Sequence, residues 1–193
     1  MTENGCGKAK SDLRRKIRAG MESLSPVQRG AQSAQLRARL ARDKFFAAAK
    51  TILFFAPLPD EPDLRPLLAE ALAAGKLVAL PRFDPATKKY GAGQIRNPAG
   101  DLVPGQFGIQ EPNNYCPALP LNRLDLILVP GVAFDLRGRR LGRGKGFYDQ
   151  LLADVRGRTC GVAFDEQIVA DIPVEPHDIP LNCILTPTRW IEP

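Results

Sequence analysis

Residues 125–149 read DLILVPGVAFDLRGRRLGRGKGFYD, and the rest of the chain is organised around this stretch. Residues 125–129 form an apolar run after an acid, and Pro130-Gly131 ends it, which is the pattern of a buried strand. Three glycines then alternate with two cations over residues 142–146, and Phe147 begins a segment typical of a helix. The stretch therefore predicts a strand, a glycine-rich loop and a helix.

The glycine-rich loop has the composition of a phosphate site. Alternating glycines let backbone N–H groups approach an anion, and a helix that begins directly afterwards adds the positive end of its dipole. Arg143 and Lys145 add full charges, and Arg140 lies close by in the sequence. A P-loop would need Ser or Thr at position 146, where this chain has Gly146. The dinucleotide fingerprint would need glycine at position 147, where this chain has Phe147, so neither motif is present. The alternative is a glycine-rich hairpin with solvated cations.

Apolar runs separated by helical segments extend this pattern along the chain. Buried strands are expected at 51–55, 77–80, 159–164 and 182–186, and helices at 9–21, 26–42, 63–74 and 147–154. Ser25, Pro26 and Gln28 form a helix-start signature with a capping box. The sequence thus predicts an α/β fold: a three-layer α/β/α single domain over residues 1–193 with a mixed, largely parallel central sheet. Residues 1–7 are expected to form a loose tail.

The composition is that of a globular protein. The 193 residues are 44% hydrophobic and 25% charged, and no apolar run approaches the 18 residues of a membrane span. The N-terminal residues are polar and give no secretory signal. Four scattered cysteines without C-x-x-C spacing, together with one histidine, argue against structural zinc. A reduced, cytoplasmic location and no membrane partner are expected.

The net charge of +6 is unevenly distributed. Residues 1–50 hold 12 Lys or Arg against 4 Asp or Glu, whereas the remainder is slightly acidic. A basic RNA-associated protein is therefore one alternative function. Aromatic residues do not alternate with these cations as they do in single-strand binding platforms, so we expect no nucleic acid partner.

A family resemblance follows from the central stretch. P-G-V-A-F-D-x-x-G-x-R-L-G-R-G-K-G-F-Y-D closely resembles the signature of 5-formyltetrahydrofolate cyclo-ligases, also called 5,10-methenyltetrahydrofolate synthetases. The resemblance extends over nearly the whole chain. It implies ATP- and Mg²⁺-dependent conversion of 5-formyltetrahydrofolate to 5,10-methenyltetrahydrofolate, with ADP and phosphate as products. Small molecules would be the partners, and a monomer is expected, with a dimer as the alternative.

The resemblance assigns an ATP site. Lys10, Arg14 and Arg18 are spaced four apart, so they share a helix face, where they repel one another unless an anion is present. The family has a Lys-x-x-x-Arg pair near the N-terminus that contacts ATP phosphates, and Lys10 and Arg14 match it. Arg143 and Lys145 would act as catalytic cations. The implied ATP-binding residues are Lys10, Arg14, Arg140, Leu141, Gly142, Arg143, Gly144, Lys145, Gly146, Phe147 and Tyr148.

Folate contacts are implied at three positions. Glu61 follows the first predicted strand, where the family has a glutamate that contacts folate, although Pro62 makes the match inexact. Phe107 can pack on the flat pterin, or it can belong to the core. Tyr148 is the third. The family often has Tyr-Tyr-Asp where this chain has Phe147, so the first hydroxyl is absent here.

Two carboxylates complete the expected site. Asp149 and Asp178 match the acids with which the family binds Mg²⁺, and hard oxygen ligands beside phosphates suit that ion. Asp165 and Asp171 are alternatives for the second position. His177 is read as a loop residue, since the reaction does not require a base there. A second alternative function is a regulator that binds a nucleotide or phosphometabolite without turnover.

Overall fold

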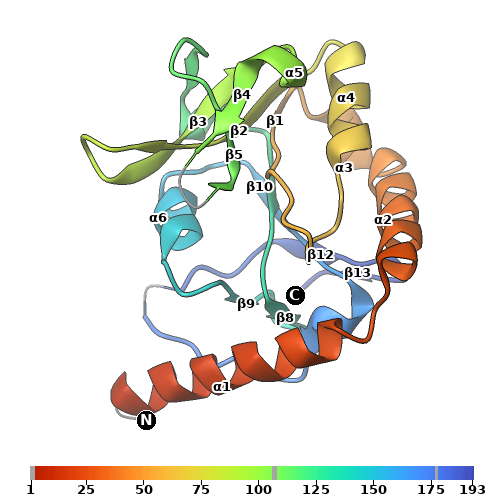
Figure 1. The fold of residues 1–193 in the computed structure, drawn as a ribbon, viewed down its shortest axis with the longest axis vertical. Helices are drawn as coiled ribbons and strands as arrows, with labels where there is room; N and C mark the ends of the chain where they lie inside the picture. Colours follow the sequence, from red (N-terminus) through yellow and green to blue (C-terminus); the bar gives the residue numbers. More distant parts are fainter. Residues whose placement is uncertain (1–2, 106–107, 177) are drawn as a thin grey trace.

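The computed structural model describes residues 3–105, 108–176 and 178–193, and a mixed sheet forms its centre (Figure 1). Within this part of the chain the sheet has eight strands in the order β13-β12-β10-β7-β1-β2-β3-β6. Neighbours from β12 to β2 pair in parallel, and β13, β3 and β6 add antiparallel edges. The strands are β1 (Thr51–Leu53), β2 (Leu77–Asp84), β3 (Lys89–Ile95), β6 (Ala118–Leu119), β7 (Leu126–Val129), β10 (Arg158–Val162), β12 (Cys183–Leu185) and β13 (Trp190–Ile191). The predicted mixed, largely parallel α/β sheet is confirmed.

One face of the sheet is covered by helices α2 (Pro26–Ala41), α3 (Lys44–Ala48) and α4 (Arg65–Ala73). The strands present alternate residues to this face, so Leu126 and Leu128 pack here while Ile127 and Val129 point to the other. Leu36 and Leu40 of α2 lie in the same cluster and are almost fully buried. Burial of such side chains stabilises the fold by roughly 1.5–3 kcal/mol each.

The start of α2 shows how local sequence fixes an element. The Ser25 hydroxyl accepts a hydrogen bond from Gln28 N at 3.2 Å, and Gln28 Oε1 accepts one from Ser25 N at 2.8 Å. This is the predicted capping box, which satisfies two backbone donors that the first turn leaves without helical partners.

The other face is only partly helical. The helix α6 (Phe147–Ala153) packs there through Leu151 and Leu152. Beside it lies a three-stranded sheet in the order β11-β8-β9, formed by β8 (Ala133–Asp135), β9 (Arg140–Leu141) and β11 (Ile168–Val169). Helix α1 (Glu3–Met21) packs through Ile17 and Met21 on residues of β8 and β9. The glycine-rich residues 142–146 therefore connect this small sheet to α6.

The remaining elements lie mostly toward the β3 edge. Strands β2 and β3 form a long antiparallel hairpin, and β4 pairs with β5 beside it. The Glu111 carboxylate of β5 accepts a hydrogen bond from Phe83 N of β2 at 2.8 Å, which fixes the two segments to each other. These elements are α5 (Pro98–Asp101), β4 (Leu102–Pro104), β5 (Gln110–Pro112) and the short 3₁₀ helices η2 (Leu121–Arg123) and η3 (Asp165–Gln167).

Helix α1 differs from the sequence prediction. It begins at Glu3, six residues before the expected start, so residues 3–7 are helical and the predicted loose tail over residues 1–7 is wrong there. The reason is tertiary: Cys6 is buried, and its thiol donates to the carbonyl of Val174 at 3.6 Å. The first turns thus pack against a loop near the other end of the chain, a contact that local sequence does not reveal.

Strand lengths also differ from the expected ones. Strand β1 ends at Leu53 rather than residue 55, although Phe54 N still bonds to Ala79 O at 2.9 Å. Strand β2 continues to Asp84, because its hairpin with β3 extends the pairing beyond the parallel sheet. In the described residues, no helix is both long enough and apolar enough to cross a membrane.

Candidate active site

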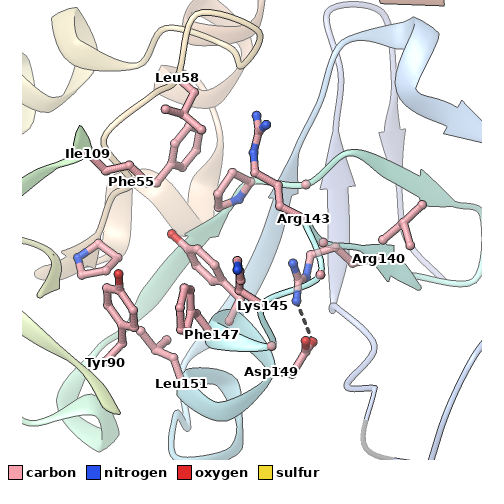
Figure 2. A pocket seen from close by; sticks show the side chains of 18 of the residues that line it. Phe55, Leu58, Tyr90, Ile109, Arg140, Arg143, Lys145, Phe147, Asp149 and Leu151 are labelled. Atoms are coloured by element: carbon pink, nitrogen blue, oxygen red, sulfur yellow. Dashed lines mark hydrogen bonds and ion pairs between the residues drawn. The ribbon is translucent and has the colours of Figure 1, made fainter. Parts of the chain in front are cut away.

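A cavity of about 420 Å³ lies where β1 and β7 end. Phe55 and Ala56 follow β1 into its wall, Pro130 and Gly131 follow β7, and the glycine loop with α6 forms another wall. Loops at the carboxyl ends of parallel strands are where α/β sheets bind ligands. Figure 2 shows that cationic side chains gather on one side of this cavity and aromatic rings on the other.

The glycine loop, residues 142–146, has a backbone that its sequence makes possible. Gly144 and Gly146 have φ angles of +93° and +67°, in the region that disfavours side chains. The Arg14 guanidinium of α1 donates through Nε to the carbonyl of Gly142 at 2.8 Å. An ideal Cβ on Gly144 would lie 3.4 Å from Arg14 Cζ. The loop and α1 are therefore in close contact.

Arg143, which lines the cavity, pairs with two carboxylates of the segment after β1. Its Nη2 lies 2.6 Å from Asp60 Oδ1 and 3.0 Å from Glu61 Oε1. Glu61 is buried, and its other oxygen accepts a hydrogen bond from Leu58 N at 3.0 Å. Burial raises the pKa of Glu61 above its ordinary value, more than the Leu58 N–H and Arg143 lower it. The residues after β1 and the glycine loop are thus joined across the site by an ion pair.

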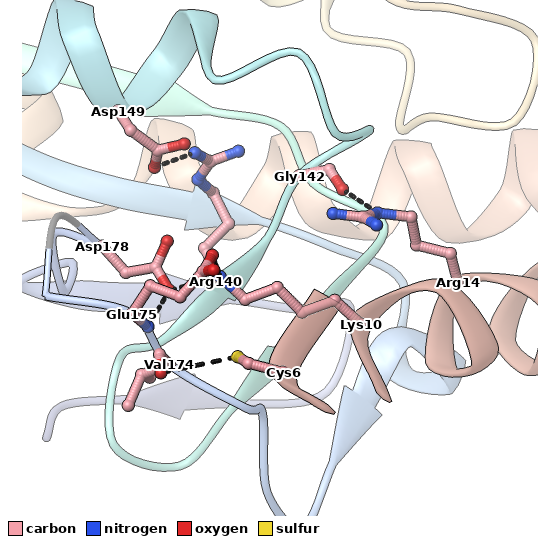
Figure 3. A network of polar contacts seen from close by, with 9 residues as sticks. All are labelled: Cys6, Lys10, Arg14, Arg140, Gly142, Asp149, Val174, Glu175 and Asp178. Carbon is pink, nitrogen blue, oxygen red and sulfur yellow. Dashed lines mark hydrogen bonds and ion pairs between the residues drawn. The ribbon is translucent and has the colours of Figure 1, made fainter. Parts of the chain in front are cut away.

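Arg140 and Asp149 form a second ion pair, which Figures 2 and 3 both show. Arg140 Nη2 donates to Asp149 Oδ1 at 2.6 Å, and the Arg140 guanidinium lies 5.6 Å from the ring centre of Tyr148. Arg140 is buried, yet its Nε has no hydrogen-bond partner among the residues that the structure describes. Burial also raises the pKa of Tyr148, so its hydroxyl stays protonated at neutral pH. The Arg140 guanidinium can therefore bind a further anionic partner through Nε.

Lys10 meets two carboxylates in a third cluster (Figure 3). Its ammonium lies 2.7 Å from Glu175 Oε2 and 2.6 Å from Asp178 Oδ2, and all three residues line the cavity. Burial lowers the pKa of Lys10, but the hydrogen bonds to Asp178 and Glu175 outweigh it and raise the pKa overall. Helix α1 thereby delivers a fixed positive charge to the same cavity as the glycine loop.

Aromatic residues form the opposite side. Tyr90 of β3 packs on Phe147 with ring centres 4.7 Å apart, and Phe83 lies 5.3 Å from Tyr90. The Tyr90 hydroxyl donates to Glu111 Oε1 at 3.4 Å. Burial, followed by the charge of Glu111, raises the pKa of Tyr90 to about 12. An aromatic, mostly apolar wall with a few polar groups suits a heterocyclic ligand.

The cavity brings together most of the residues expected from the sequence. It is lined by Lys10, Arg14, Glu61, Arg140, Leu141, Gly142, Arg143, Gly144, Lys145, Gly146, Phe147, Tyr148, Asp149 and Asp178. Phe107 and His177 lie outside the described residues. Asp165 and Asp171, the alternative metal ligands, do not line the cavity: Asp165 accepts from Thr186 at 2.6 Å, and Asp171 pairs with Arg139.

Sequence reasoning missed four polar residues that shape the site. Asp60 and Glu175 contact the cations Arg143 and Lys10, and Tyr90 and Glu111 line the aromatic side. Asp60 adjoins the predicted Glu61 and could have been found by that proximity. Glu175 and Tyr90 lie in segments without a recognisable motif. Glu111 belongs to a short Glu-Pro element that resembles one of the family, but sequence reasoning assigned no role to this glutamate.

The carboxylates suit magnesium in type and number. Among the described residues no three His, Cys, Asp or Glu side chains group closely enough to hold a metal alone. Mg²⁺, however, usually binds one or two carboxylates together with phosphate oxygens and waters. Asp149 and Asp178 both line the cavity beside the glycine loop, so they fit that donor set.

Comparisons with known proteins identify a family. The model of the 5-formyltetrahydrofolate cyclo-ligase family matches residues 6–187. The 5-formyltetrahydrofolate cyclo-ligase of Escherichia coli K12 is 35% identical over 90% of this chain and 97% of its own. That of Mycolicibacterium smegmatis is 34% identical over 95% of this chain and 96% of its own.

Solved structures give the same result. The NMR structure of Aquifex aeolicus 5,10-methenyltetrahydrofolate synthetase superposes with a TM-score of 0.86 at 34% identity, covering 95% of this chain and 92% of that one. The Mycoplasma pneumoniae 5,10-methenyltetrahydrofolate synthetase shares the fold, with a TM-score of 0.74 at 21% identity over 92% of this chain and 98% of that one. Fold and sequence similarity converge: this chain belongs to the 5-formyltetrahydrofolate cyclo-ligase family.

Proposed function

We propose that this chain catalyses the ATP-dependent cyclisation of 5-formyltetrahydrofolate to 5,10-methenyltetrahydrofolate, with release of ADP and phosphate. Family membership supports this activity. The observation that carries it is the division of one cavity into a cationic glycine-loop side and an aromatic side. A triphosphate and a pterin can therefore meet within the same enclosed space.

The ATP phosphates would lie along the glycine loop. Backbone N–H groups of residues 142–146 would cradle them, and Lys10, Arg14 and Arg140 would neutralise their charge. Arg143 and Lys145 are the catalytic cations in this proposal. Arg143 now pairs with Asp60 and Glu61, and a phosphate would compete with these carboxylates for the guanidinium.

The folate would occupy the aromatic side. Glu61 and Tyr148 are proposed to orient the pterin, Glu61 as an acceptor and Tyr148 through its ring and protonated hydroxyl. Phe107, proposed from sequence for the same role, lies outside the described residues. Glu61 is buried and Tyr148 is half-buried, so little water would reach the Glu61 carboxylate, which strengthens its electrostatic interactions.

Magnesium would be held by Asp149 and Asp178 together with phosphate oxygens. When bound, the ion would neutralise part of the negative charge on the phosphates. The protein's own task is to keep the two carboxylates available at the phosphate end of the cavity, where the cations Arg140 and Lys10 now pair with them.

The reaction needs no protein nucleophile. The formyl oxygen attacks the γ-phosphorus of ATP, ADP leaves, and the formyl carbon gains a phosphate leaving group. N10 then attacks that carbon, loses its proton, and phosphate departs as the ring closes. Positioning of the formyl oxygen near the phosphorus, and stabilisation of charge by Arg143 and Lys145, are the contributions we assign to the protein.

We also propose that the enzyme acts in the cytoplasm as a monomer with small-molecule partners. The four cysteines are free and buried, which suits a reducing compartment.

The direct test mixes the pure protein with 5-formyltetrahydrofolate, ATP and Mg²⁺ and follows the near-ultraviolet absorbance of the methenyl product. An ATP-dependent rise in this band is expected. ATP binding by calorimetry without the band would favour a nucleotide-binding regulator instead. The absence of both the absorbance band and ATP binding would contradict the assignment of the cavity.

A further inference from the structure

The loop that precedes β12 brings two carboxylates to a single cation. Glu175 Oε2 and Asp178 Oδ2 lie 2.7 Å and 2.6 Å from Lys10 Nζ, and the Lys10 side chain is only 9% exposed. Asp178 is the residue to which sequence assigns a metal role, whereas no role has been assigned to Glu175. One buried ammonium with two carboxylate partners raises the question of what the second partner does.

The spacing of these carboxylates is fixed by the loop itself. Glu175 N donates to Asp178 Oδ2 at 2.8 Å, and Asp178 N donates to Glu175 O at 3.0 Å. The loop is in turn anchored at both sides: Ile172 N donates to the buried Asp135 at 3.1 Å, and the Cys6 thiol donates to Val174 O. Figure 3 shows the three carboxylates Glu175, Asp178 and Asp149 around Lys10 and Arg140. Glu175 is therefore held where it can orient Lys10.

We propose that Glu175 is a positioning residue for Lys10: it holds the ammonium toward the phosphate end of the cavity, so that Asp178 can take another ligand without leaving Lys10 unpaired. A buried cation that loses its only partner carries a large desolvation cost, and a second carboxylate removes that cost. This inference rests on the proposed ATP site, and it assigns to Glu175 a task distinct from that of Asp178.

The direction of the change in ATP affinity distinguishes a positioning role of Glu175 from a purely electrostatic one. If Glu175 only added negative charge near the phosphates, Glu175→Gln would bind ATP more tightly because repulsion is removed. If Glu175 orients Lys10, the same variant binds ATP more weakly, by about tenfold for one lost charge-assisted hydrogen bond. The two readings thus predict opposite changes.

The experiment measures ATP binding by calorimetry with excess Mg²⁺ and no folate, for the wild type, Glu175→Gln, Lys10→Met and the double variant. Glu175→Gln should weaken ATP binding, and the double variant should bind no more weakly than Lys10→Met alone, because Glu175 acts through Lys10. Glu70→Gln, an exposed residue of α4, is the matched control and should bind like the wild type.

Two further measurements complete the test. The Mg²⁺ concentration needed for half-maximal activity should stay unchanged in Glu175→Gln but rise in Asp178→Asn. The KM for ATP should rise in Glu175→Gln, while the KM for 5-formyltetrahydrofolate and the thermal unfolding midpoint stay near the wild-type values.

Three results would overturn the proposal: tighter or unchanged ATP binding in Glu175→Gln, additive effects in the double variant, or a magnesium requirement shifted as in Asp178→Asn. The last would make Glu175 a metal ligand. Failure of the wild type to bind ATP would instead overturn the proposed function, and this inference with it, so the two failures are distinguishable.

Discussion

Arg140 Nη2 lies 2.6 Å from Asp149 Oδ1, so a cation proposed for phosphate holds a carboxylate proposed for metal. Lys10 and Asp178 repeat this relationship at 2.6 Å. The cations and carboxylates of the site therefore neutralise one another's charges. If ATP and Mg²⁺ bind together, both ion pairs can be replaced, because the cations can then pair with phosphate and the carboxylates can bind the metal. Either ligand alone would leave the opposite charge without a partner, so we expect the two to bind cooperatively.

Asp149→Asn should raise the magnesium requirement. The amide keeps the shape of the side chain but loses the negative charge that a hard cation needs. We expect the Mg²⁺ concentration for half-maximal turnover to rise by about tenfold or more. Asp154→Asn, at an exposed position after α6, is the control. A magnesium titration identical to that of the wild type would remove Asp149 from the proposed ligands.

Lys145→Ala should weaken the use of ATP. Lys145 lines the cavity within the glycine loop, and the variant removes a cation proposed to contact phosphate. A lost interaction with a charged group corresponds to about a tenfold or larger rise in the KM for ATP, with a lower kcat as well. Lys16→Ala, on the exposed side of α1, should behave like the wild type. If Lys145→Ala has the same KM for ATP and the same kcat as the wild type, the Lys145 ammonium faces solvent.

Glu61 should make stability depend on pH. Because burial raises its pKa in the folded state above the ordinary value of 4.5, the folded protein binds this proton more tightly than the unfolded chain. The free energy of unfolding contributed by this group therefore falls as pH rises from about the ordinary value through the raised pKa. Glu61→Gln cannot ionise, so it should lose this dependence.

The measurement is the thermal unfolding midpoint of the wild type and of Glu61→Gln between mildly acidic and neutral pH. The variant should gain stability relative to the wild type as pH rises, while its turnover falls because the proposed pterin contact is altered. Glu70→Gln should run parallel to the wild type. A constant difference between the wild type and Glu61→Gln across the range would contradict the raised pKa.

Ser25→Ala should destabilise the fold without changing the chemistry. The variant removes the side-chain acceptor of the α2 capping box, which typically costs about 1 kcal/mol. Denaturant unfolding measures this loss, and kcat and both KM values should stay unchanged. Ser11→Ala, at an exposed position inside α1, has no cap to lose and should not destabilise the protein. Equal destabilisation by both changes would argue against the cap.

The sequence predicted the elements whose signal is local. The apolar runs at β1, β7 and β10 and the capping box of α2 all lie in short windows, and each forms near its expected place. The early start of α1 was missed because Cys6 is buried by Val174, 168 residues away. The second face carries α6 as expected, but β8 and β11 of the small sheet also place Phe134 and Ile168 in the cluster on that face.

The candidate site likewise contains parts with a local sequence signal and parts without one. The glycine loop is contiguous, so its position beside a helix start was predictable from residues 142–147. The pairing of Arg143 with Glu61 joins segments 82 residues apart, and the pairing of Lys10 with Glu175 joins segments 165 residues apart. Such partners are chosen by the packing of the whole chain, and their spacing in sequence carries no signal.

The joining of Lys10 in α1 to the loop before β12 also bears on how the protein is made. A nascent chain that has emerged only as far as the glycine loop lacks Glu175 and Asp178, so its proposed phosphate site is incomplete until residues 175–178 leave the ribosome. Nucleotide would then bind only chains in which this loop has emerged and packed against α1. ATP should accordingly protect α1 and the loop before β12 together from proteolysis, and cleavage in either segment should abolish that protection in the other.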